Sequence, residues 1–78
     1  MEKFSQEWFE NEFVEMLKLM EPQDPEDEEC VGNLIAMLMP FLSGKYQLDT
    51  FELAPHFVQF FNNTPEQFFY DAAKQAVR

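Results

Sequence analysis

Cysteine and histidine are almost absent from this chain of 78 residues, which contains Cys30, His56 and no other residue of either type. One cysteine cannot form a disulfide within the chain, so the framework is not that of a disulfide-stabilised secreted domain. Zinc sites need clusters of Cys and His, and one of each is too few. The N-terminal residues also lack the basic and apolar segments of a signal peptide, so we expect a cytoplasmic protein.

Basic residues are also scarce, since five Lys and Arg stand against 15 Asp and Glu and the formal net charge is −10. A surface that binds DNA or RNA needs enough cations to neutralise phosphates, so we expect no direct binding to nucleic acid. The same charge repels acidic membrane surfaces and attracts basic proteins. The apolar stretch 30–42 is shorter than the roughly 20 residues that span a bilayer, so we expect no membrane partner.

Motifs for catalysis and for cofactors are missing as well. The chain has two glycines, and Ser43-Gly44-Lys45 lacks the upstream glycines and the strand of a phosphate-binding loop. The acidic run 24–29 lacks the alternating ligands and the central glycine of a calcium loop. We therefore expect a protein without enzyme activity, cofactor or metal site.

Apolar residues recur at helical spacing, and no stretch alternates with the period of a strand. We predict an all-α fold, a small bundle of four short helices in one domain that covers residues 1–78. Ser5 is the expected N-cap of the first helix, and Asp24 is the expected N-cap of the central helix. The central helix should end near Leu42, because Pro40 removes a hydrogen bond and Ser43-Gly44 follows.

The third helix should begin at Asp49, where Asp49 and Glu52 have the spacing of a capping pair. Pro55 is expected to break or kink this helix. Thr64-Pro65-Glu66-Gln67 predicts a capping box at the start of the fourth helix. The expected core consists of Phe9, Phe13, Leu17, Leu34, Ile35, Leu38, Phe57, Phe60, Phe61, Phe69 and Ala73.

A second group of side chains lies off the main apolar stripe of the first helix. Phe4, Trp8 and Leu19 fall on a different face, with Glu12 and Glu15 among them. In one interpretation Trp8 covers the edge of the core; in the other, an aromatic and acidic patch binds a partner, since Trp is enriched at binding hot spots. The predicted partner-binding residues are Phe4, Trp8, Glu12, Glu15, Leu19, Glu26 and Asp27.

These observations favour a small acidic protein–protein interaction module, such as an adaptor, an inhibitor or a small subunit of a complex. An aromatic patch rimmed by carboxylates would bind a protein with a basic surface, and surplus aromatic area could also form a homodimer. The alternative is a nucleic-acid mimic of the anti-restriction or anti-defence type. Residues 1–29 carry 11 acidic and 2 basic side chains, and in a mimic these carboxylates would occupy the basic cleft of a DNA- or RNA-binding protein.

Overall fold

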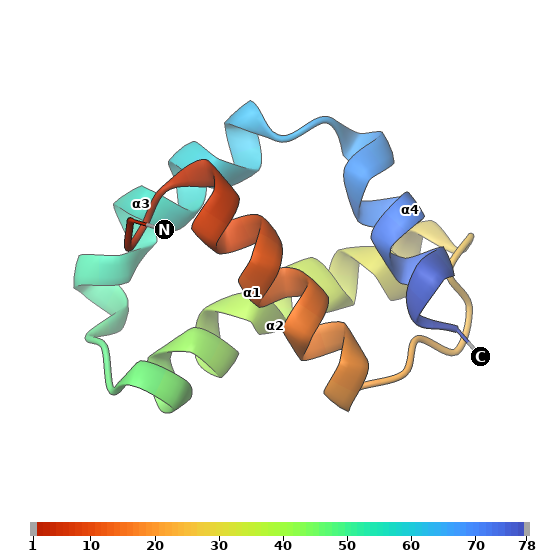
Figure 1. The fold of residues 1–78 in the computed structure, drawn as a ribbon, viewed down its shortest axis with the longest axis horizontal. Coiled ribbons are helices and arrows are strands. Elements are labelled where there is room, and N and C mark those ends of the chain that lie inside the picture. The colour runs from red at the N-terminus through yellow and green to blue at the C-terminus, as the bar shows by residue number, and fades with distance from the viewer. Residues whose placement is uncertain (1, 78) are drawn as a thin grey trace.

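Four α-helices form the described part of the chain, residues 2–77, in a computed structural model (Figure 1). α1 spans Gln6–Leu19, α2 spans Glu28–Tyr46, α3 spans Thr50–Asn63 and α4 spans Glu66–Ala76. In Figure 1, α1 crosses in front of α2, and α3 and α4 lie toward opposite ends of the molecule. α1 packs against each of the other helices, and α2 packs against α3 and α4. The predicted all-α bundle of four helices is confirmed.

Polar side chains cap the starts of α1 and α3, as the sequence predicts. The Ser5 hydroxyl oxygen accepts a hydrogen bond from the Trp8 amide at 3.1 Å. The Asp49 carboxylate accepts one from the Phe51 amide at 2.9 Å. Each cap satisfies an amide that has no partner within the first turn of its helix.

The start of α2 lies one turn later than predicted, so the assignment of Asp24 as its N-cap is wrong. Asp24 instead accepts a hydrogen bond from the Glu26 amide at 3.2 Å and stabilises the turn before the helix. Asp27 is the N-cap, and its carboxylate accepts a hydrogen bond from the Cys30 amide at 3.2 Å. The two Asp residues have the same capping chemistry, and the one nearer the apolar stretch begins the helix.

The end of α2 lies one turn beyond the predicted position near Leu42. Gly44 has no positive φ and continues the helix to Tyr46. Gln47 then adopts the left-handed conformation, with φ 54° and ψ 48°, and its amide donates to the Ser43 carbonyl. The predicted stop at Ser43-Gly44 is therefore wrong, and the C-cap of α2 is Gln47 instead.

The two interior prolines lie within continuous helices. Pro40 and Pro55 each lack the amide that would donate to the carbonyl four residues earlier, on Ala36 and Phe51. Both of these residues are exposed, so the unused carbonyls lie on the solvent side of their helices. Of the two forms predicted for the third helix, the one divided at Pro55 is wrong.

The predicted capping box at the start of α4 does not form. The Thr64 hydroxyl donates to the Phe60 carbonyl at 2.6 Å and accepts from the Gln6 side-chain amide at 2.6 Å. No side chain caps α4, and the Gln67 amide group donates to Asp71 instead. The buried hydroxyl of Thr64 thus joins the end of α3 to α1, because these contacts satisfy it better than a local cap would.

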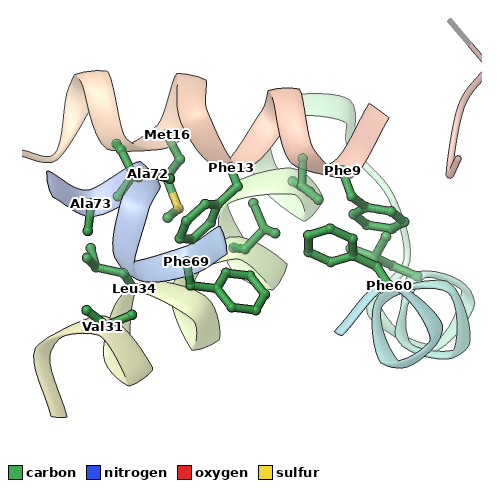
Figure 2. Packing of buried hydrophobic residues seen from close by; sticks show 13 residues of the cluster. Phe9, Phe13, Met16, Val31, Leu34, Phe60, Phe69, Ala72 and Ala73 are labelled. Carbon is green, nitrogen blue, oxygen red and sulfur yellow. The ribbon is translucent and has the colours of Figure 1, made fainter. Parts of the chain in front are cut away.

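Four phenylalanine rings form the centre of the core (Figure 2). Phe9 stacks on Phe60 with a centroid distance of 4.9 Å, and Phe13 meets Phe69 edge-on at 5.3 Å. Phe60 and Phe69 are themselves edge-on at 6.0 Å. None of the four is more than 2% exposed, and together they join α1, α3 and α4. Edge-to-face pairs of this kind stabilise a core beyond the area that they bury.

Most of the predicted core is buried. Ile35 and Phe57 are only partly buried, at the edge of the cluster. The assignment of Phe61 to the core is wrong, because its side chain is 46% exposed. Phe61 lies about 100° around α3 from the buried Phe60, toward the side that carries the exposed Val58. The confirmed residues are Phe9, Phe13, Leu17, Leu34, Leu38, Phe60, Phe69 and Ala73.

Replacement of Gln47 by glycine should stabilise the protein. A left-handed conformation is unfavourable for residues with a Cβ, and glycine removes this penalty while loosening the unfolded chain. We expect Gln47→Gly to raise the free energy of unfolding by about 0.5–1 kcal/mol, measured by urea denaturation. Gln47→Ala keeps the Cβ and should give no gain. Equal stability of the two variants would contradict the left-handed end of α2.

Candidate functional site

The structure divides the predicted partner-binding residues between the two ends of α1. Phe4 and Trp8 lie at its N-terminal end and Glu12 lies in its middle, and all three are close to the end of α2 or to α3. Leu19 is the last residue of α1, and Glu26 and Asp27 lie in the connection to α2. Positions 8 and 19 are about 16 Å apart along the helix axis. The seven residues therefore do not form one continuous patch.

The aromatic residues of the N-terminal group pack against the core. Phe4 and Trp8 are edge-on at 5.4 Å, and Phe4 stacks on His56 at 4.4 Å with the ring planes 4° apart. Trp8 also lies edge-on to Phe9 at 4.9 Å and is 5.6 Å from Tyr46. Both Phe4 and Trp8 are partly buried against the core cluster. Their position matches the edge-of-core interpretation, because part of each side chain is covered by the core.

Glu12 is a buried acidic residue in the middle of α1, only 8% exposed. Its carboxylate accepts hydrogen bonds from the Lys45 ammonium at 2.9 Å and from the Tyr46 hydroxyl. Both partners belong to the last turn of α2, and these bonds hold that turn against α1. Glu12 is therefore already engaged within the chain, unlike a free carboxylate at the rim of a binding surface.

Glu12 also changes the acid–base behaviour of its two partners. Its hydrogen bonds raise the pKa of Lys45 above the ordinary 10.5 and the pKa of Tyr46 above the ordinary 10.0. Each group thus holds its proton more tightly in the folded state than in the unfolded state. Their contribution to the free energy of unfolding is complete below about pH 10 and is lost as the pH rises through the folded-state pKa values.

Substitution of Glu12 tests this arrangement. We expect Glu12→Gln to lower the free energy of unfolding at pH 7 by about 1–3 kcal/mol, because charge-assisted hydrogen bonds are lost. The further loss of stability above about pH 10 should be smaller than in the parent, since the carboxylate is the main cause of both pKa shifts. Urea denaturation across this pH range measures both effects.

Glu15→Gln is the matched control. Glu15 is exposed and pairs with Lys18 at 3.2 Å on the surface of α1. Exposed pairs contribute little, so stability should change by no more than about 0.5 kcal/mol. If the free energy of unfolding of Glu12→Gln falls above about pH 10 as steeply as that of the parent, the Glu12 carboxylate is not the cause of the two pKa shifts, and the arrangement is contradicted.

The remaining predicted site residues lie on the surface. Leu19 is 75% exposed at the end of α1. Glu26 lies 3.7 Å from the Lys74 ammonium, and Asp27 caps α2. Met20 beside it is 36% exposed, and these two apolar side chains are flanked by the acidic Glu21, whereas the exposed apolar residues of α3 have no charged residue among them.

The most exposed aromatic side chain lies on α3, where the sequence analysis placed no site. Phe51 is 89% exposed, Val58 53% and Phe61 46%. The spacings of seven and three residues place these side chains on one side of the helix. Pro55 is exposed between them, and none of the four residues is charged. Phe51, Pro55, Val58 and Phe61 together are the α3 face.

The α3 face continues at Phe61 into a cleft of about 330 Å³ between α2, α3 and α4. Most of its lining is apolar, and two carboxylates also reach it. Gly32 of α2 contributes bare backbone, and a Cβ at this position would have nothing within 4 Å. The residues of this α2–α4 cleft are Glu28, Val31, Gly32, Ile35, Phe61, Thr64, Glu66, Phe69 and Tyr70.

Comparison of the chain with protein-family models, with curated proteins and with solved structures finds no match. Within residues 2–77, no helix has the length and hydropathy needed to cross a bilayer. No group of three or more His, Cys, Asp and Glu side chains in the same range could hold a metal ion.

Proposed function

We propose that this protein is a small acidic interaction module, acting as an adaptor, an inhibitor or a small subunit, and that it binds a partner protein through the α3 face. The observation that carries the proposal is the exposure of Phe51, Val58 and Phe61 on one side of a helix whose other side is firmly packed. Contiguous exposed apolar side chains mark interaction sites on soluble proteins. Their burial against a partner contributes about 25 cal/mol per Å² of apolar surface.

The charge of the chain supports a partner with basic groups around its apolar contact. A net charge of −10 attracts basic surfaces over long range and speeds encounter with them. The α3 face itself is uncharged, so apolar contact would hold the complex after encounter. We place this complex in the cytoplasm, where a single unpaired cysteine stays reduced.

A nucleic-acid mimic is the alternative proposal, and the structure gives it less support. A mimic needs free carboxylates in a broad array. Glu12 is buried and bonded to two groups of α2, and Asp27 caps a helix. A mimic also has no use for the exposed side chains of the α3 face.

Capture of partners from a native lysate tests the proposal. We expect the parent protein to retain its partner at about 50 mM and about 200 mM salt, because screening weakens exposed charge pairs far more than apolar contacts. The double variant Phe51→Ser/Val58→Ser should retain at least tenfold less partner than the parent, while its circular dichroism spectrum stays unchanged. Leu19→Ser removes an apolar side chain from α1 whose exposure, 75%, lies between those of Phe51 and Val58, and should keep the partner.

Two results would contradict the proposal. Retention of the partner by the double variant would show that the α3 face is not the contact. A partner that leaves at the higher salt and is displaced by DNA would favour the mimic instead.

A further inference from the structure

We propose that the α2–α4 cleft binds a helix of the partner protein that presents an apolar anchor side chain next to an arginine or lysine. This inference rests on the proposed function and specifies the chemistry of the segment that the partner contributes. Phe61 belongs to both the cleft and the α3 face, so one partner can cover both surfaces.

The size and the lining of the cleft suit an apolar anchor. Its volume of about 330 Å³ lies at the lower end of the range of ligand pockets, which is enough for a few side chains. Val31, Ile35 and Phe69 line it with apolar surface. Anchors that fill such pockets near the centre of an interface supply most of the binding energy in protein complexes.

Gly32 favours a helix as the segment that enters. Glycine inside a helix costs about 1 kcal/mol relative to alanine, and nothing in this chain would obstruct a Cβ at this position. Packing within the protein therefore does not require glycine here. A missing side chain lets another backbone approach closely, and helices come within about 8 Å of each other when the residues at the contact are small.

The carboxylates of the cleft select a basic segment. Glu28 and Glu66 line it, in the first turns of α2 and α4. Across residues 2–77, neither carboxylate forms an ion pair, and no Lys or Arg lines the cleft. Helix dipoles favour acidic residues at these positions, and a cation from a partner would supply the neutralising charge that residues 2–77 do not.

Tyr70 lies within the field of these carboxylates. Burial of the phenol, and then the charges of Glu66, Glu28 and Asp27, raise the pKa of Tyr70 above the ordinary 10.0. The ring lies in the negative potential of these carboxylates, where a guanidinium or ammonium group can also contact its face. A second copy of this chain would bring a further charge of −10 to the same place, which disfavours it as the occupant.

Synthetic helical peptides test the occupant directly. The probe is a peptide of about 16 residues with leucines at helical spacing and arginines beside them, and its matched controls carry glutamine or glutamate in place of arginine. Titration calorimetry gives the affinity, and ¹⁵N NMR locates the site. We expect the arginine peptide to shift the amides of Gly32, Ile35 and Tyr70, the glutamine peptide to bind several-fold more weakly and the glutamate peptide not to bind.

Substitutions at the two glycines of α2 distinguish binding of the arginine peptide in the cleft from its general attraction to an acidic protein. Gly32→Leu should fill the cleft and weaken the arginine peptide at least tenfold. Gly44→Leu is the matched control, because Gly44 is exposed on the same helix, lies outside the cleft and also has nothing within 4 Å of its Cβ position. Both changes replace glycine by a better helix former, so neither should unfold the protein. Glu66→Gln should weaken the arginine peptide several-fold at low salt.

Four results would overturn the inference. One is binding of the glutamate peptide as tight as that of the arginine peptide. Another is that Gly32→Leu and Gly44→Leu bind the arginine peptide with the same affinity. The third is self-association of the parent that Gly32→Leu abolishes, since the occupant would then be a second copy. If the captured partner still depends on Phe51 and Val58 while Gly32→Leu has no effect, the inference fails and the proposed function stands.

Discussion

The burial of Phe60 between Phe9 and Phe69 determines how α3 is rotated about its own axis. Once Phe60 and Leu53 face inward, the residues on the opposite side of the helix must face solvent. Those residues include Phe51 and Val58, which any other rotation of α3 would bury at the expense of the core. The exposed apolar surface is thus a consequence of how the core is packed, and a complex would cover it at no cost to the fold.

A second constraint acts where Glu12 joins α1 to the last turn of α2. This contact extends α2 past Gly44 and fixes its end next to the start of α3. The position of α3 therefore depends on a buried carboxylate from the first third of the chain. One acidic residue of the N-terminal region serves structure in this way, while Glu28 and Glu66 line a cleft that opens to solvent.

The sequence was sufficient to predict what depends on local chemistry. Helical spacing identified four helices, and Ser5 and Asp49 were recognisable as caps because their partners lie within three residues.

The sequence was insufficient where contacts between residues far apart in the chain determine the structure. The hydroxyl of Thr64 fits a local cap equally well but bonds to Phe60 and Gln6. The sequence analysis placed Phe4, Trp8 and Glu12 in a patch, but it did not show that His56 and Tyr46 pack against Phe4 and Trp8. The sequence analysis assigned Phe61 of the α3 face to the core with Phe57 and Phe60, and it gave Phe51 and Val58 no place in a core or a site.

The central claim is that the α3 face is not needed for folding, and urea denaturation tests it most directly. Phe51→Ser/Val58→Ser should unfold within about 1 kcal/mol of the parent, because exposed substitutions away from special features have small effects. Phe60→Ala, on the opposite side of the same helix, should lose about 3–5 kcal/mol. A loss in the double variant as large as that in Phe60→Ala would mean that Phe51 and Val58 belong to the core, and would contradict the account.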